Sequence, residues 1–332
     1  MSQLQSFRAF RIKNDETDGY RSGIETLTLD DLNPGEVVIR SAYSSVNFKD
    51  ALAGTGKGKI LRRFPLVGGI DVAGHVLQSR DPAFKEGDAV LVTGSGLSET
   101  RDGGYSEIAR LDARWVIPLP AGLSLRESMI LGTAGFTAAL ALLRMVENRQ
   151  TPELGPLAVT GATGGVGSLA VAIFAKAGFE VHAISGKPEH AEYLKALGAN
   201  EVLGRDALET TRPMETARFG GGLDNVGGPM LTSLLAQTAP YGNVASAGLA
   251  ASAQLDATVM PFIIRGVSLL GVASAGTARD IREEVWRRLA SDWKPATLDA
   301  ICTREIALDG LQEVFATMLA GQSQGRSVVR IQ

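Results

Sequence analysis

Cysteine and histidine are scarce in this sequence of 332 residues. The single cysteine, Cys302, excludes an intrachain disulfide and a zinc site built from cysteines. The three histidines, His75, His182 and His190, are too scattered along the chain to suggest a metal site of their own. This composition predicts a cytoplasmic protein that does not depend on disulfides.

Charge of one sign and long apolar runs are also lacking. The 33 basic and 36 acidic residues nearly cancel, so no strong basic field points to a nucleic-acid partner. The longest apolar stretch, 134–143, is too short to cross a bilayer. Residues 1–19 carry basic residues without an apolar segment, so we expect no secretory signal and no membrane partner.

Glycine and hydrophobic residues are plentiful, with 39 glycines and 45% hydrophobic residues. The length predicts two domains. After about residue 125, short apolar runs alternate with helical patterns, which is typical of a parallel sheet in an α/β fold. A long helix is expected at 127–146, then strands at 157–160, 179–184, 200–203, 223–226, 243–247 and 267–272, with helices at 166–177, 189–197, 229–238, 258–265 and 279–290.

The two ends of the chain have a different pattern, richer in strands. Strand patterns occur at 7–12, 36–41, 65–76 and 87–92, and the end of the chain predicts a strand, a helix and a strand at 301–307, 311–319 and 327–331. We expect this tail to pack back on the first domain. The predicted domains are therefore 1–128 together with 297–332, and 129–296.

A glycine-rich turn lies between the first strand of the alternating region and the helix that follows. It reads Gly161-Ala162-Thr163-Gly164-Gly165-Val166-Gly167. Glycines let a dinucleotide pyrophosphate approach the backbone closely, and the amides at the start of a helix favour negative charge. The spacing is a variant of the usual dinucleotide fingerprint and predicts a nicotinamide cofactor.

The end of the next strand indicates which cofactor binds. An acidic residue there would bind the ribose 2′-hydroxyl of NADH, but the sequence reads Ser185-Gly186-Lys187, with Arg205 after the following strand. A hydroxyl, a free backbone amide and two cations suit a 2′-phosphate, so we predict NADPH. The alternative role for Ser185 is to cap the helix that begins at Pro188.

Several short strings, read together, resemble one enzyme family. They are Ser45–Leu52, Gly56–Ile60, Phe64–Pro65, Gly69–Asp71, Gly132–Ala138, Val259–Ile263 and Gln324–Arg326. This set is similar to the NADPH-dependent acryloyl-CoA reductases of the medium-chain dehydrogenase/reductase superfamily, a group also described as quinone oxidoreductases. The resemblance implies a GroES-like β-rich catalytic domain and a six-stranded doubly wound Rossmann domain.

The resemblance also separates this chain from zinc alcohol dehydrogenases. Those enzymes carry cysteine and histidine ligands where this chain reads Asn47-Phe48-Lys49-Asp50 and Gly69-Ile70-Asp71. The loop 94–104 has no cysteines for a structural zinc. We therefore expect an enzyme without zinc.

Further cofactor contacts follow from the resemblance. It implies that Thr163, Gly164, Gly165 and Val166 meet the pyrophosphate, and that Leu249, Ile263 and Ser274 lie near the nicotinamide half. For the two apolar residues of the second group, plain core packing is the alternative. The family usually has tyrosine where this chain has Phe48, which leaves ring stacking as its only cofactor contact.

The implied reaction reduces the carbon–carbon double bond of acryloyl-CoA to propanoyl-CoA. Hydride reaches the β carbon, negative charge develops on the thioester oxygen, and a proton is added at the α carbon. Asn47 is either the donor that orients the substrate or the N-cap of the helix after it. Asp71, in an apolar strand, must face a pocket or pair with a cation such as Arg326, which is also a candidate cofactor contact. Asp50 is expected to support the site.

Two other functions remain open at this stage. One is a quinone or enone reductase with the same hydride chemistry, and the other is an NADPH-binding protein without enzymatic activity. The apolar strand at 267–272 is expected at a sheet edge, where pairing with a second copy of the chain predicts a homodimer.

Overall fold

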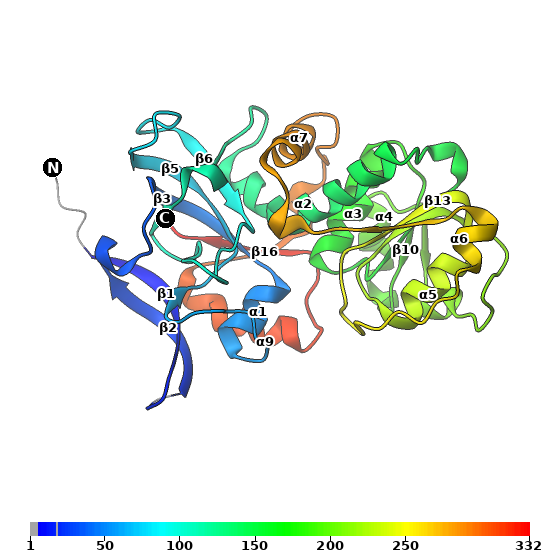
Figure 1. Ribbon diagram of the computed structural model, residues 1–332, viewed down its shortest axis with the longest axis horizontal. Helices are drawn as coiled ribbons and strands as arrows, with labels where there is room; N and C mark the ends of the chain where they lie inside the picture. Colours follow the sequence, from blue (N-terminus) through cyan, green and yellow to red (C-terminus); the bar gives the residue numbers. More distant parts are fainter. Residues whose placement is uncertain (1–5, 18) are drawn as a thin grey trace. The chain divides into compact units, whose positions relative to one another are not determined.

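The computed structural model describes residues 6–17 and 19–332 (Figure 1). The chain forms two compact units. The first, here called the β-rich unit, contains the described residues up to Thr133 together with 275–284 and 302–332. The second, the parallel-sheet unit, contains 134–274 and 285–301. The chain passes from one unit to the other at 133–134 and at 301–302, close to the predicted domain boundaries. The sequence pattern did not predict that residues 275–284 would join the β-rich unit.

The parallel-sheet unit is built on a six-stranded sheet in the order β11-β10-β9-β12-β13-β14, and all its strand pairs are parallel. The strands are β9 (Leu157–Thr160), β10 (Val181–Ile184), β11 (Glu201–Leu203), β12 (Phe219–Asp224), β13 (Thr238–Ser246) and β14 (Ser268–Gly271). This order confirms the predicted doubly wound sheet. The order reverses between β9 and β12, and ligands of such sheets bind at that point.

Helices follow the strands as the sequence predicts. They are α3 (Gly165–Lys176), α4 (Ala191–Ala196), α5 (Gly228–Ala236) and α6 (Met260–Arg265), with α7 (Arg279–Leu289) and α8 (Leu298–Ile301) after the last strand. The helix α3 directly follows the glycine-rich turn, and its residues from Gly167 to Phe174 are buried. The turn is therefore held by a helix that is anchored in the core.

The long helix α2 (Leu125–Glu147) is the one helix among the described residues that is long and apolar enough to cross a membrane by length and composition. Of its most apolar 18-residue window, 83% is buried inside the structure. This is the burial of a core helix. The predicted helix at 127–146 is confirmed, although its backbone is not helical at Gly132.

The β-rich unit contains two sheets. The smaller has the order β2-β1-β4, and the larger has the order β15-β16-β3-β5-β6-β8, with β7 paired to β3. The strands are β1 (Phe7–Asp15), β2 (Gly19–Leu27), β3 (Val37–Val46), β4 (Leu66–Val67), β5 (Asp71–Ser79), β6 (Ala89–Thr93), β7 (Ile108–Leu111), β8 (Ile117–Pro118), β15 (Cys302–Ile306) and β16 (Arg326–Arg330), and the helices are α1 (Phe48–Thr55) and α9 (Leu311–Leu319).

The end of the chain packs on its beginning, as predicted. Strand β16 pairs antiparallel with β3, with Ser327 opposite Val46. Helix α9 packs on α1, and the ring of Phe315 lies so close to Gly54 that a β-carbon there would be 2.3 Å from it. This return places Arg326 beside the residues that join β3 to α1.

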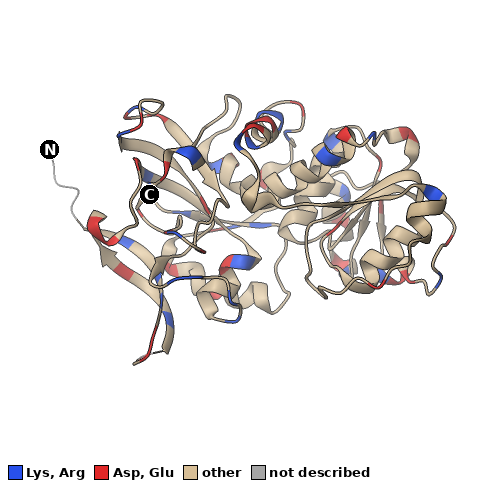
Figure 2. Ribbon diagram, in the orientation of Figure 1, with Lys and Arg blue, Asp and Glu red and all other residues tan. Residues whose placement is uncertain are grey.

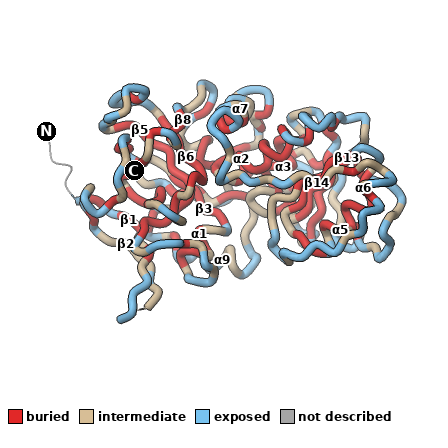
Figure 3. Tube along the Cα trace, viewed as in Figure 1, coloured by how far each residue is buried: buried red, intermediate tan, exposed pale blue. Residues whose placement is uncertain are grey.

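Burial and charge are distributed as in an ordinary globular domain. Buried segments concentrate in the strands of the sheets (Figure 3), and basic and acidic residues are interspersed over both units (Figure 2). Against this background, the buried polar residues of the β-rich unit stand out.

Candidate active site

A cluster of buried polar side chains lies where β3 ends and β5 and β16 begin. Its members are Ser45, Asn47, Asp50, Asp71 and Arg326, each at most 8% exposed. We call it the buried polar cluster. The structure thus brings together the three predicted catalytic residues and the predicted cation.

Asp71 is the first residue of β5, and its carboxylate is saturated with hydrogen bonds. One oxygen accepts from Ser45 Oγ at 2.5 Å and Asn47 Nδ2 at 2.8 Å. Thr133 donates its hydroxyl to the other oxygen at 2.5 Å, and its backbone N–H lies within 3.1 Å of both. These donors offset the cost of burying a carboxylate.

Arg326 supplies a buried positive charge beside Asp71. Its guanidinium donates to Ile130 O at 3.0 Å, Val46 O at 2.9 Å, Asn47 Oδ1 at 3.1 Å and Ser45 Oγ at 2.7 Å. Burial lowers the pKa of Arg326, while the nearby carboxylates of Asp71 and Asp50 raise it. Because the ordinary pKa of arginine is so high, the side chain stays charged. Its predicted cofactor contact remains a prediction.

Asn47 links the two charges. Its amide nitrogen donates to Asp71 at 2.8 Å and to Asp50 at 3.2 Å, and its amide oxygen accepts from Arg326. Asn47 is also the N-cap of α1, and its own backbone N–H donates to Asp50 at 2.9 Å. The N-cap interpretation of Asn47 is therefore confirmed, and its side chain is fixed at both ends. Its role as a donor that orients the substrate stays a prediction.

Asp50 lies on α1 and holds the start of that helix to the strand that carries Asp71. One oxygen accepts from the backbone N–H of Ile70 at 3.0 Å. Burial, and then the charge of Asp71, raise the pKa of Asp50 to about 7, against hydrogen bonds from Asn47 and Ile70. The carboxyl group therefore changes its protonation state near neutral pH.

A second buried cation stands near Asp71. Arg282, on α7, donates to the carbonyl and the hydroxyl of Thr93, which lies opposite Asp71 in the β5–β6 ladder. Burial lowers the pKa of Arg282 to about 10, while the charge of Asp71 raises it. Arg282 therefore adds a second positive charge near this carboxylate.

The break in α2 also belongs to this cluster. Gly132 has φ 50° and ψ −157°, and a β-carbon there would lie 2.7 Å from both Asp71 Oδ2 and Ser45 Oγ. The break turns the N–H of Thr133 toward Asp71. Sequence reasoning assigned no role to Ser45, Gly132 or Thr133. The available signal was a glycine followed by threonine inside an apolar helical pattern.

In the parallel-sheet unit, the glycine-rich turn has the features of an anion site. Gly161 has φ 60°, and a β-carbon at Gly167 would lie 2.3 Å from the carbonyl oxygen of Gly161. Gly164 is the N-cap of α3 and provides no side-chain cap. The first amides of α3 are thus left for a ligand, and the turn fits a pyrophosphate.

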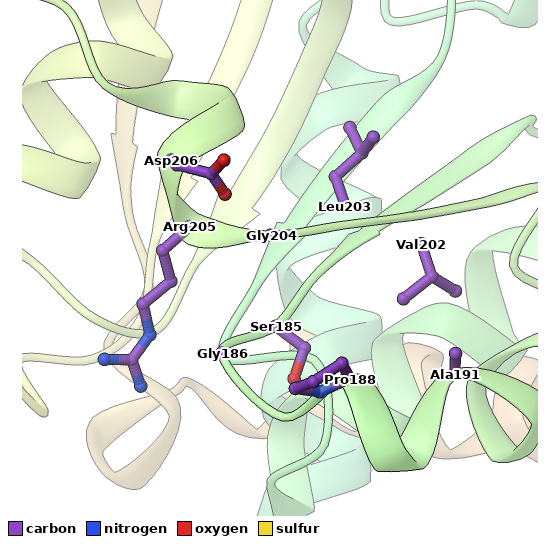
Figure 4. A pocket seen from close by; sticks show the side chains of 9 residues that line it. All are labelled: Ser185, Gly186, Pro188, Ala191, Val202, Leu203, Gly204, Arg205 and Asp206. Atoms are coloured by element: carbon purple, nitrogen blue, oxygen red, sulfur yellow. The ribbon is translucent and has the colours of Figure 1, made fainter.

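Three of the predicted phosphate-binding residues, Ser185, Gly186 and Arg205, lie around one cavity (Figure 4). This cavity has a volume of about 420 Å³, and its walls are Ser185, Gly186, Pro188, Ala191, Val202, Leu203, Gly204, Arg205 and Asp206. A smaller cavity of about 50 Å³ is lined by Thr163 together with Ser185, Lys187 and Arg205. The glycine-rich turn and the predicted 2′-phosphate residues therefore share one site.

Ser185 is buried, and its Oγ accepts from the backbone N–H of Lys187 at 3.1 Å. The short 3-10 helix Pro188–His190 has Lys187, not Ser185, at its N-cap position. The alternative interpretation of Ser185 as a helix cap is therefore wrong. Its hydroxyl hydrogen has no acceptor in the part of the chain that the structure describes, so it is available to a ligand.

The remaining predicted cofactor contacts are dispersed. Phe48 is the first residue of α1 and is 52% exposed. Leu249, after β13, and Ile263, on α6, are 65% and 74% exposed, which argues against the alternative of core packing. Ser274 begins the 3-10 helix Ser274–Gly276. Their cofactor contacts stay predictions.

No group of three or more histidine, cysteine, aspartate or glutamate side chains within residues 6–17 and 19–332 is placed to hold a metal ion. At Asp71, where the resemblance implies that zinc enzymes carry a ligand, both carboxylate oxygens accept hydrogen bonds from the protein. The donor set therefore does not fit zinc.

We predict that Gly132→Ala destabilises the protein by about 3 kcal/mol or more, because it adds strain at a positive φ to a collision with Asp71 and Ser45. Gly87→Ala is the control, since Gly87 has φ 89° and open space around it. It should cost about 1 kcal/mol. Chemical denaturation measures both, and equal losses would contradict the collision.

We also predict a pH dependence that Asp50 controls. Its folded-state pKa, about 7, lies above the ordinary 3.8, so the folded protein holds a proton that the unfolded chain has released. This contribution to stability is complete below about pH 4 and is lost as the pH rises to about 7. In Asp50→Asn this decline should be absent, and in Asp30→Asn, at an exposed site, it should persist. Parallel curves of unfolding free energy for the wild type and Asp50→Asn would contradict the assignment.

Two family models match the chain. The model described as an alcohol dehydrogenase GroES-like domain matches residues 33–121, in the β-rich unit. The model described as a zinc-binding dehydrogenase matches residues 165–291 and begins at the glycine-rich turn. The matches agree with the order of the two predicted domains.

Relatives and solved structures resemble the whole chain. YhfP of Bacillus subtilis, named as a quinone oxidoreductase, is 45% identical over 93% of this chain and 94% of its own length. Acrylyl-CoA reductase AcuI of Ruegeria pomeroyi is 44% identical over 98% of this chain and 99% of its own length.

Two crystal structures have nearly the same fold. The yhdH oxidoreductase of Salmonella enterica in complex with NADP has a TM-score of 0.94 and 43% identity, covering 98% of this chain and 100% of that chain. The Bacillus subtilis yhfP structure with NAD bound has a TM-score of 0.95 and 43% identity, with the same coverage. With identities of this size over almost the whole of each chain, this protein belongs to the acryloyl-CoA reductase family of the medium-chain dehydrogenase/reductase superfamily.

Proposed function

We propose that this protein reduces the carbon–carbon double bond of acryloyl-CoA to propanoyl-CoA with NADPH, by hydride transfer to the β carbon and without zinc. The observation that carries the proposal is the cavity in which Ser185, Lys187 and Arg205 meet the glycine-rich turn. The name of the relative AcuI supports the substrate.

The choice of NADPH rests on charge. No acidic residue stands directly after β10, where the sequence reads Ser185-Gly186-Lys187, and the cavity beside its end has two cationic side chains and the Ser185 hydroxyl. These groups suit a 2′-phosphate, which the NADP of the yhdH structure carries and the NAD of the yhfP structure lacks. NADPH, when bound, supplies the hydride. The amides at the start of α3 and the side chain of Thr163 would hold its pyrophosphate.

The β-rich unit supplies the groups that position the substrate. Reduction of a conjugated thioester places negative charge on its oxygen, and a nearby cation lowers the energy of that charge. Arg326 provides this field, and its hydrogen bond to Asn47 fixes the amide that begins α1. Phe48, next in the chain and exposed, offers an apolar ring for stacking. Asp50, with a pKa near 7, holds a proton inside the same cluster.

The absence of zinc is part of the proposal. The positions that would carry metal ligands hold Asn47 and Asp71, and both are engaged by hydrogen bonds. The field of Arg326 takes the place of a Lewis acid in stabilising charge on the substrate. The name of the zinc-binding family model describes that model and not these residues.

We further propose that the protein is a cytoplasmic homodimer. Strand β14 lies at the edge of the parallel sheet and is only partly buried. Exposed apolar side chains occur on α6, which packs on the neighbouring β13, and just before it, namely Val259, Met260, Ile263 and Ile264. A second copy pairing along β14 would cover both features.

A quinone reductase is the second candidate, because the relative YhfP is named as a quinone oxidoreductase. The two candidates use the same cofactor and differ in the acceptor. An NADPH-binding protein without activity is the third, and it predicts binding without turnover.

One spectrophotometric series separates these functions. NADPH loss is followed with acryloyl-CoA, crotonyl-CoA and a benzoquinone, and the series is repeated with NADH. We expect the highest kcat/KM with acryloyl-CoA and a preference for NADPH of about tenfold or more, the size of a lost charged hydrogen bond. Faster turnover of the quinone, oxidation by none of the acceptors, or a preference for NADH would each contradict the proposal. Stoichiometric zinc whose removal stops turnover would contradict its zinc-free part.

A further inference from the structure

Gly186 has no backbone reason to be glycine. Its φ lies outside the left-handed region that favours glycine, unlike that of Gly161 in the turn nearby. Position 186 has no room for a side chain, because a β-carbon there would lie 2.6 Å from Nε and 2.9 Å from Cζ of Arg205. The guanidinium of Arg205 therefore lies directly against the backbone of Gly186.

Arg205 depends on this contact for its position. Within residues 6–17 and 19–332 its side chain has no hydrogen bond or ion pair. The neighbouring Asp206 does not hold it, since the two side chains point in different directions (Figure 4). The packing on Gly186 keeps the cation beside Ser185, whose hydroxyl hydrogen is free.

On these grounds we infer that Gly186 is a specificity-determining residue for the 2′-phosphate of the cofactor, and that it acts by positioning Arg205. The inference rests on the proposed function, since it takes NADPH as the cofactor. A methyl group at position 186 would not strain the backbone. It would push the flexible Arg205 side chain out of the cavity and so remove one charged hydrogen bond to the phosphate.

The test compares the binding of 2′,5′-ADP and AMP, which differ only in the 2′-phosphate, by calorimetry. We expect Gly186→Ala to weaken 2′,5′-ADP binding by about tenfold or more and to leave AMP binding unchanged. Gly204→Ala is the matched control in the same cavity, because a β-carbon there meets Asp206 and not Arg205. It should keep the preference for 2′,5′-ADP at or above the wild-type value.

A double-mutant cycle tests whether Gly186 acts through Arg205. Arg205→Ala should weaken 2′,5′-ADP binding as Gly186→Ala does, and the double variant should bind it no more weakly than Arg205→Ala alone. A wild-type preference in Gly186→Ala, an equal loss of both nucleotides, or an additive double variant would overturn the inference. If the wild type itself does not prefer 2′,5′-ADP to AMP, the proposed NADPH specificity is overturned, and the inference with it.

Discussion

The buried carboxylate of Asp71 is the constraint on which the β-rich unit depends. A buried charge must be paired and hydrogen-bonded, and here the donors come from parts of the chain far apart in sequence. Ser45 comes from the end of β3, Asn47 from the start of α1, and Thr133 from the break in α2. Arg326, from β16, adds the positive charge. The same interaction thus fixes four backbone segments and builds the proposed site.

In the parallel-sheet unit, by contrast, groups that can bind an anion have no partner within the described residues. The amides at the start of α3 have no side-chain cap, and Arg205 has no partner in the part of the chain that the structure describes. The cost of leaving these groups unpaired is limited, because Arg205 lines a cavity and the first residues of α3, Gly165 and Val166, are partly exposed. A phosphorylated dinucleotide would satisfy both, and this supports the proposal of NADPH.

The sequence was most informative where function depends on local pattern. Alternating strands and helices predicted the parallel sheet, and the residues after β10 predicted a phosphate site whose members share one cavity. An aspartate in an apolar strand predicted a partner for Asp71. Its donor Thr133 was not predicted, because it approaches only where α2 breaks. The position of Arg205 on Gly186 likewise depends on contacts between turns that follow separate strands.

The central claim is that Asp71 and Arg326 balance each other inside the β-rich unit, and a double-mutant cycle of unfolding free energy tests it most directly. The measurement uses Asp71→Asn, Arg326→Met and the double variant at pH 6, where Asp50 is largely protonated. Each single variant removes one member of the buried pair and should cost about 3–5 kcal/mol. The double variant should cost clearly less than the sum of the two. Additive losses would contradict the claim.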